Sequence, residues 1–198
     1  CPGSCAGSDQ LFIVQNAFST SARRGTKRPF RSARSAAAAK GNLASEIPGW
    51  DFAAVRSAAR EAWNGIFSRM VAEGTESQMR TFYPSLYHLF IQPNDIADVG
   101  EEPFYSTFSY WDTFRAAHPL YTILVPERVD GFLRTMLEHG RAHGHLPVWT
   151  LWGQETHDMI AVHSIPVMVD AYFKGFKGID WNEALDRMVV TLTKTRKD

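Results

Sequence analysis

The chain has 198 residues and a formal net charge of zero. This length suits one ordinary domain, and a neutral chain gives no global argument for binding nucleic acid or an acidic membrane. No apolar run approaches the length needed to span a bilayer, so the composition favours a globular protein with a buried core.

Residues 1–41 are interpreted as an irregular, basic N-terminal segment. Gly, Ser, Ala and Arg dominate it, and residues 1–40 hold seven basic residues against one acidic residue. Residues 11–14 are compatible with a short strand and the Ala-rich run 35–40 with a helix. A weakly ordered lead-in is favoured over a nucleic-acid-binding arm, because no recognition motif or interleaved aromatic residue accompanies the charges.

From residue 51 onward the apolar spacing becomes helical. Apolar residues three and four apart predict a helix that Asp51 caps and Gly74 ends. A second helix is predicted over residues 77–90, with Pro84 expected to bend or interrupt it. Residues 92–108 are predicted to form a long loop.

A short helix containing residues 111–117 follows, capped by Ser109 and ending near Pro119. Pro126 suits the first position of the next helix, which is expected to start ending at residues 139–140.

Residues 144–155 are predicted to form a loop, and Thr156 to open a helix that runs to about Lys174 with a kink at Pro166. Residues 180–183 resemble a capping box that starts the last helix. About six successive helices with weak strand signals predict an all-α fold built from helical hairpins.

Residues 110–115, with the sequence YWDTFR, concentrate the chemistry that a sugar ring requires. The Trp111 ring can cover the apolar face of a pyranose, while Asp112 accepts and Arg115 donates hydrogen bonds to neighbouring hydroxyls. Their spacing of three also suits a simple surface ion pair. The aromatic neighbours favour the sugar-binding interpretation, because a buried ion pair in an aromatic wall is costly unless it serves a ligand or a network.

A second carboxylate, Glu155, follows Trp149 and Trp152. At the foot of the predicted helix it could simply be favoured by the helix dipole. Partial desolvation by the two rings would instead favour the protonated carboxyl, which is the form that a general acid needs near neutral pH.

The histidines do not have the spacing of a metal site. His139, His143 and His145 cluster, but Gly140 and Gly144 are expected to splay them. The HExxH, CxxC and GxSxG motifs and a phosphate-binding glycine loop are all absent from the sequence. His88 either lines a polar pocket or is a core histidine.

Several motifs occur together in a consistent order between residues 42 and 188. They are residues 42–43, 46–52, 82–83, 86–88, 108–115, 118–120, 146–149, 155–156, 159–160, 170–172 and 174–175. As a set they resemble the catalytic domain of glycoside hydrolase family 92, the exo-acting α-mannosidases.

This resemblance implies that residues 42–198 form part of an (α/α)6 barrel and that the activity is calcium-dependent, inverting hydrolysis of terminal α-linked mannose in glycans. It implies that Glu155 is the general acid and that Trp111, Asp112 and Arg115 form a wall around the terminal mannose. His88 is a further candidate for that pocket. The family also suggests a secreted or periplasmic protein, and it leaves the calcium ligands outside this chain.

The chain also departs from the family. Family members are much longer, and the usual catalytic base and the residues near calcium lie in a later half of the barrel. Pro84 follows Tyr83 where Thr is usual, and Ala161 replaces a common Gly. The chain is therefore expected to be a fragment with the general acid but without the usual base, and to turn over little or no substrate alone. A noncatalytic carbohydrate-binding or scaffold module, and a related glycosidase for another sugar, are the alternatives.

Overall fold

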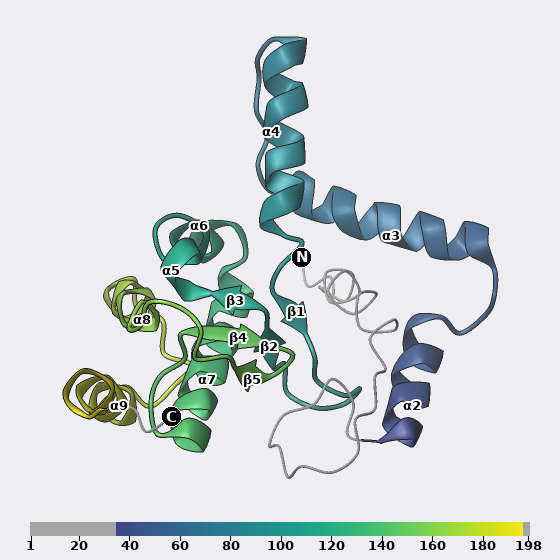
Figure 1. Ribbon diagram of the computed structural model, residues 1–198. Coiled ribbons are helices and arrows are strands. Elements are labelled where there is room, and N and C mark those ends of the chain that lie inside the picture. Colours follow the sequence, from purple (N-terminus) through teal and green to yellow (C-terminus); the bar gives the residue numbers. More distant parts are fainter. Residues whose placement is uncertain (1–34, 196–198) are drawn as a thin grey trace. The chain divides into compact units, whose positions relative to one another are not determined.

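A computed structural model describes residues 35–195 of the chain (Figure 1). The strand considered at residues 11–14 and most of the basic N-terminal segment lie outside the described residues. The chain divides into two compact units, one ending at Glu101 and the other containing the residues from Glu102 onward. Both units are mostly helical with a few short strands, as the sequence predicts.

The described part of the first unit consists of α2 (Ala36–Glu46), α3 (Phe52–Phe67), α4 (Glu76–Leu89) and β1 (Asn94–Asp95). Helices α3 and α4 contact each other, and the Trp63 ring lies 4.5 Å from that of Tyr87. Buried Asn42 joins α2 to the segment after β1. Its amide donates to Asp98 Oδ1 at 2.8 Å, and its Oδ1 accepts from the Val99 N–H at 2.9 Å.

The first unit confirms one predicted cap and corrects two helix boundaries. Asp51 Oδ1 accepts the backbone N–H groups of Ala53 and Ala54. Helix α3 ends at Phe67 and not at Gly74, and the hydroxyl of the capping residue Ser68 donates to the Gly65 carbonyl in the last turn. Pro84 does not interrupt α4, since its exposed position leaves the unpaired carbonyl one turn back accessible to solvent.

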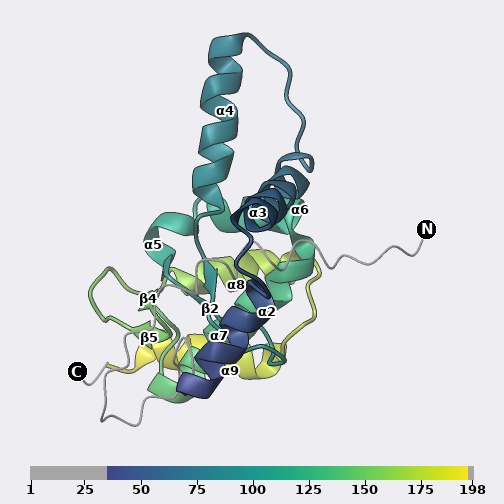
Figure 2. The same cartoon turned by 90° about the vertical axis from the view of Figure 1, so that its right-hand side faces the viewer.

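The second unit is organised around α7 (Pro126–His143), which contacts helices and strands on several sides (Figures 1 and 2). Its neighbours are β2 (Tyr105–Ser106), α6 (Ala117–Leu124), β5 (Gln154–Glu155), α8 (Ser164–Phe173) and α9 (Trp181–Thr193). Leu133, Met136 and Leu137 of α7 are fully buried, and the Phe132 ring lies 4.6 Å from the Tyr105 ring. This packing forms the core that supports the sheet described next.

A three-stranded antiparallel sheet replaces the loop predicted over residues 144–155. Strand β3 (Phe108–Ser109) pairs with β4 (Trp149–Leu151), which pairs with β5. Trp152 and Gly153 connect β4 to β5 with φ angles of 50° and 72°. Two positive φ angles in a two-residue connection are typical of a type I′ hairpin turn, and a Trp-Gly pair is a weak sequence signal for it.

Two prolines lie in the first turn of a helix, although the sequence predicted a helix end at Pro119 and a kink at Pro166. The helix predicted over residues 111–117 is only one turn long, α5 (Tyr110–Thr113), and Pro119 lies in the first turn of α6. Helix α8 begins at Ser164 and not at Thr156, so Pro166 lies in its first turn. Proline is tolerated there because the N–H groups of a first turn have no intrahelical partner.

Helix α7 starts at Pro126 as predicted but continues through Gly140 to His143. It ends at Gly144, whose φ of 79° is the left-handed conformation typical of a helix C-terminus. Among residues 35–195 no helix combines the length and the apolar character needed to cross a membrane.

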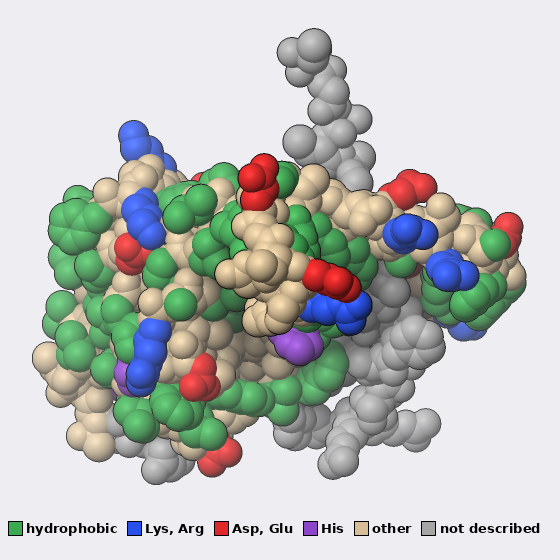
Figure 3. All heavy atoms as spheres, turned by 90° about the horizontal axis from the view of Figure 1, so that it is seen from above, with side chains coloured by type: hydrophobic (Ala, Val, Ile, Leu, Met, Phe, Trp, Pro, Cys, Tyr) green, Lys and Arg blue, Asp and Glu red, His purple; other side chains and the backbone are tan. Residues whose placement is uncertain are grey.

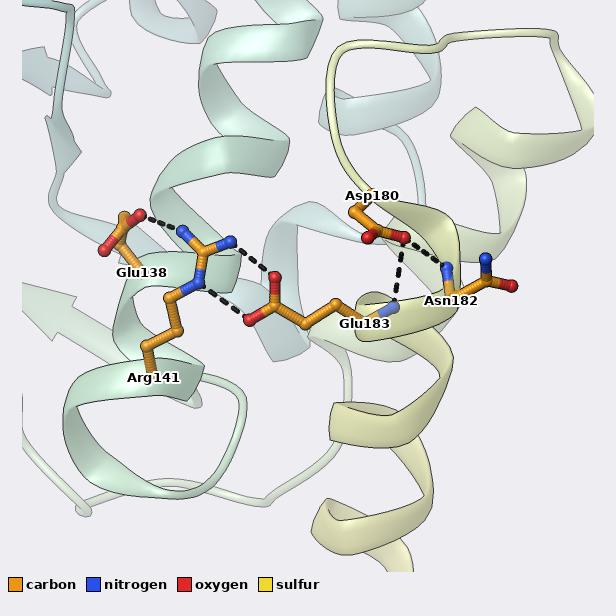
Figure 4. Close-up of polar contacts among 5 residues, drawn as sticks. All are labelled: Glu138, Arg141, Asp180, Asn182 and Glu183. Carbon is orange, nitrogen blue, oxygen red and sulfur yellow. Dashed lines mark hydrogen bonds and ion pairs between the residues drawn. The ribbon is translucent and has the colours of Figure 1, made fainter.

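The last helix, α9, begins as predicted. Asp180 Oδ1 accepts the N–H groups of Asn182 and Glu183 at 2.9 and 3.3 Å (Figure 4). The Glu183 carboxylate does not complete a capping box and instead pairs with Arg141 of α7, at 2.7 Å from Nε and 2.5 Å from Nη2. Arg141 also pairs with Glu138, so this ion-pair cluster connects α9 to α7.

Candidate active site

The sheet brings together the two sequence stretches that carry the candidate chemistry. Ser109 of β3 pairs with Trp149 of β4, and Glu155 of β5 pairs with Thr150 of β4. The Tyr110 N–H, where β3 passes directly into α5, donates to the Val148 carbonyl at 3.3 Å. Residues 108–113 and 148–155 are therefore neighbours in space, although about forty residues separate them in sequence.

The Glu155 carboxylate is held by backbone N–H groups. Its Oε2 accepts from Val148 at 2.6 Å, and its Oε1 accepts from Trp149 at 3.2 Å and from His157 at 3.0 Å. The Thr156 N–H and hydroxyl both donate to the Trp149 carbonyl at 3.0 Å. Glu155 thus lies in a hydrogen-bonded strand, which corrects its predicted position at the foot of a helix and defines its orientation through the β4 backbone.

Tyr110 is a buried aromatic residue whose pKa is affected by the charge of Glu155. Burial, and after it the negative charge of Glu155, raises the pKa of the Tyr110 phenol well above its usual value. Trp149 is half-buried and Trp152 is 43% exposed at the hairpin turn. The sequence marks Tyr110 only as an aromatic neighbour of Trp111, because its proximity to Glu155 depends on the pairing of β3 with β4.

Asp112 and Arg115 are both exposed and do not form the surface ion pair that their spacing allows. The Ser109 hydroxyl donates to Asp112 Oδ2 at 2.6 Å. The Arg115 guanidinium carbon lies 5.5 Å from the centroid of the Phe114 ring, within cation–π range. One carboxylate and one guanidinium therefore face solvent within one turn of chain.

Trp111 is half-buried, and its indole Nε1 is buried without a hydrogen-bond acceptor. An unpaired buried N–H costs about 1–3 kcal/mol. Trp111 lies on α5, which directly follows strand β3. Trp111 is therefore attached to the same three-stranded sheet that contains Glu155.

His88 is exposed on α4 in the first unit, with its ring 5.8 Å from that of Tyr87. The alternative that it is a core histidine is wrong. The core histidines are His118 and His139, which the sequence did not distinguish. Burial lowers the pKa of His118 to about 4 and that of His139 to about 3, the latter with a contribution from His143.

Gly140 does not splay His139 and His143, because α7 continues through it. Their rings stack at 5.7 Å with an interplanar angle of 18°, whereas His145 Nε2 lies 3.2 Å from the Lys194 carbonyl oxygen. Within residues 35–195 no group of three or more His, Cys, Asp or Glu side chains is arranged to hold a metal ion. The side chains of this part of the chain therefore do not fit a calcium site.

Residues 38–198 match the family described as glycosyl hydrolase family 92 catalytic domain. An uncharacterized secreted glycosidase from Arthroderma benhamiae is 29% identical over 155 residues, which are 75% of this chain and 17% of that protein.

The fold is similar to that of a family GH92 α-mannosidase from Bacteroides thetaiotaomicron, with a TM-score of 0.76 and 28% identity over 83% of this chain and 24% of that one. The same enzyme has been solved in complex with mannoimidazole. A GH92 inverting mannosidase from Bacteroides thetaiotaomicron gives a TM-score of 0.75 and 30% identity over 79% of this chain and 23% of that one.

The chain thus spans about a quarter of the length of the two mannosidases and less than a fifth of the secreted glycosidase. The family match covers most of the chain, including every candidate residue of the sheet and of α5. On this evidence the chain belongs to glycosyl hydrolase family 92.

Proposed function

We propose that this chain supplies the proton-donating side of the active site of an inverting α-mannosidase that removes terminal mannose from glycans. The pairing of β3 with β4 and of β4 with β5 is the observation that carries this proposal, since it joins the aromatic wall of α5 to Glu155. The solved relatives, which are α-mannosidases, support the choice of sugar.

Glu155 acts as the general acid and protonates the glycosidic oxygen as the bond to the leaving group breaks. Inverting hydrolysis also requires a base carboxylate, roughly 6.5–9.5 Å from the acid, that activates a water on the opposite face of the sugar. The carboxylate accepts from Val148 at Oε2 and from Trp149 and His157 at Oε1, so the contacts of whichever oxygen carries the proton have to weaken when the carboxyl is protonated.

The terminal mannose is held by α5 and the residue that follows its C-terminal cap. The Trp111 ring covers the apolar face of the sugar, Asp112 accepts hydrogen bonds from hydroxyl groups, and Arg115 donates to them. The exposure of Asp112 and Arg115, and the lack of an ion pair between them, support this assignment. His88 lies in the first unit, and its role as a further sugar contact stays a prediction from the family resemblance.

Calcium dependence is proposed from the family resemblance, with ligands outside residues 35–195. A bound calcium ion would supply positive charge beside sugar oxygens. The catalytic base is also proposed to lie outside this chain, so the 198 residues alone should bind mannose weakly and hydrolyse little or none of it.

We further propose that these helices form part of an (α/α)6 barrel. Phe173 of α8 and Leu185, Val189 and Leu192 of α9 are at least half exposed, and hydrophobic side chains are spread over the face shown in Figure 3. Exposed apolar helix faces of this kind mark surfaces that pack against other segments. Secretion is proposed because the Arthroderma benhamiae relative is described as secreted.

A noncatalytic carbohydrate-binding or scaffold module is the second candidate. Both Glu155 carboxyl oxygens already accept backbone N–H groups, which suits a structural role as well as a catalytic one. In that case the chain would bind mannose through α5 and its flanking residues, and Glu155 would only hold the hairpin.

Two measurements on the purified chain test these proposals. Mannoimidazole is titrated by calorimetry into the wild type, Trp111→Ala and Glu155→Gln, with Asp186→Asn as the matched control, because Asp186 is exposed on α9. Both site variants should weaken binding at least tenfold, while the control should not. An aryl α-mannoside is then assayed with calcium, and little or no turnover is expected. Robust turnover that Glu155→Gln abolishes would overturn the inactivity of the isolated chain. Binding unchanged in both site variants would overturn the site.

A further inference from the structure

Ser109 lies where strand β3 passes into helix α5, and both its backbone and its side chain are held there. Its backbone pairs with Trp149 of β4, and its carbonyl accepts the Thr113 hydroxyl at 3.2 Å. Its own hydroxyl donates to Asp112 Oδ2 at 2.6 Å. Because Ser109 is half-buried and Asp112 is exposed, this hydroxyl connects the sheet to a carboxylate at the surface.

The Ser109 hydroxyl does not form the cap that the sequence predicts. A serine before a helix normally accepts a backbone N–H of the first turn, but the Ser109 side chain makes no such hydrogen bond. Its hydrogen bond goes instead to the side chain of the third residue of α5, which is Asp112. The contact therefore orients a carboxylate and does not satisfy the helix backbone.

The Asp112 carboxylate has one oxygen held by the protein and one that is not. In the described part of the chain, the hydrogen bond from Ser109 to Oδ2 is the one that this carboxylate accepts. Oδ1 can therefore accept a hydrogen bond from a ligand. An acceptor that is already fixed binds a sugar hydroxyl more tightly than a mobile one, because less side-chain freedom is lost on binding.

The same strand pairing relates Asp112 to the candidate acid. Trp149, the β4 residue that pairs with Ser109, donates its backbone N–H to Glu155 Oε1 at 3.2 Å. The two carboxylates are thus hydrogen-bonded to two residues that face each other across the β3–β4 pair. While both hydrogen bonds are intact, the sheet fixes the position of Asp112 relative to Glu155.

We propose that Ser109 is a positioning residue for sugar binding: its hydroxyl holds the Asp112 carboxylate in one rotamer, so that Oδ1 is preset to accept a hydroxyl group of the terminal mannose. This inference rests on the proposed sugar-binding role of Asp112. It adds a residue that acts on the sugar only through Asp112.

The first measurement follows the Asp112 side chain in the purified chain without a sugar. Three-bond NMR couplings between the backbone and the Asp112 carboxyl carbon report the χ1 rotamer. The wild type should populate one rotamer, and Ser109→Ala should show couplings averaged over several rotamers. Ser109→Thr keeps the hydroxyl and should keep the couplings of the wild type.

The second measurement is a calorimetric titration of mannoimidazole into the same variants and into Asp112→Ala. Ser109→Ala should weaken binding about three- to tenfold, which is the effect of ordering one more side chain on binding. Ser109→Thr should restore the affinity, and Asp112→Ala should weaken binding by about tenfold or more. Ser57→Ala is the matched control and should change neither readout, since the Ser57 hydroxyl also donates to an exposed carboxylate, Glu61 Oε1 at 3.1 Å in α3.

A single Asp112 rotamer retained in Ser109→Ala would overturn the inference. A loss of affinity in Ser109→Thr as large as that in Ser109→Ala would do the same, and so would unchanged affinity in Ser109→Ala where Asp112→Ala binds weakly. Averaged couplings in Ser109→Ala together with unchanged binding in Asp112→Ala would instead refute the proposed function, while the contact between Ser109 and Asp112 would stand.

Discussion

The backbone N–H of Val148 donates to Glu155 Oε2 at 2.6 Å. Val148 lies two residues before Thr150, the residue that pairs with Glu155 in the β4–β5 hairpin. The candidate acid is therefore also a structural acceptor of the β4–β5 hairpin. Its substitution should affect stability as well as chemistry, and the choice of replacement separates the two effects.

Glu155→Ala should destabilise the chain by about 2 kcal/mol, because it leaves three N–H groups without their acceptor, two of them in partly buried hydrogen bonds. Glu155→Gln keeps one acceptor oxygen and should lose less than half of that. Urea unfolding followed by tryptophan fluorescence measures both values. Equal stability of the two variants would show that the carboxylate does not hold the hairpin.

Gly178→Ala should destabilise the second unit by about 2–3 kcal/mol. A Cβ at this position would lie 2.2 Å from Asp130 Cγ, and the Gly178 N–H donates to Asp130 Oδ1 at 3.0 Å. Gly65→Ala is the matched control, since its Cβ would meet nothing within 4 Å in α3, where alanine is the better helix former. Thermal unfolding of both variants checks the contrast, and a neutral Gly178→Ala would contradict it.

The Arg141–Glu183 pair should contribute no more than about 1 kcal/mol, since both side chains are partly exposed and surface ion pairs are screened. A double-mutant cycle with Arg141→Met and Glu183→Gln measures the coupling between α7 and α9. The coupling should largely disappear in 1 M salt, where the Debye length is about 3 Å. Coupling that persists at high salt would indicate a contribution from packing.

Stability should fall as pH falls below about 6.5, because His118 and His139 are buried in the neutral form. Their pKa values in the folded chain, about 4 and about 3, lie below the ordinary value of 6.5. The unfolded chain therefore binds these protons first, and the stabilisation present above pH 6.5 is lost as pH falls towards 4. Each histidine should contribute a slope of about 1.4 kcal/mol per pH unit.

Urea midpoints measured between pH 7.5 and 5 check this dependence. His118→Phe removes one of the two titrating groups in a setting already lined by Phe108 and Tyr121, so it should reduce the slope by about half. A slope that His118→Phe does not alter would assign the pH dependence to other groups.

Local sequence signals were sufficient to predict a helix boundary where the boundary depends on one side chain and the neighbouring backbone. The caps at Asp51 and Asp180 and the helix start at Pro126 are confirmed, because each depends on residues two or three positions away. The sequence did not reveal β3, β4 and β5, since strands of two or three residues are too short to show an alternating pattern. Their pairing is a long-range property of the chain.

The sequence by itself determined the mostly helical class and the family, and it predicted which residues bind a sugar, because motifs and apolar periodicity are local features of the chain. The tertiary structure decided how those residues meet. It placed Glu155 in a hydrogen-bonded hairpin beside Tyr110 and left Asp112 and Arg115 without an ion pair between them. It also aligned His139, His143 and His157 in one row. These relationships depend on strand register and on the packing of α7, which bring together residues that local sequence cannot relate.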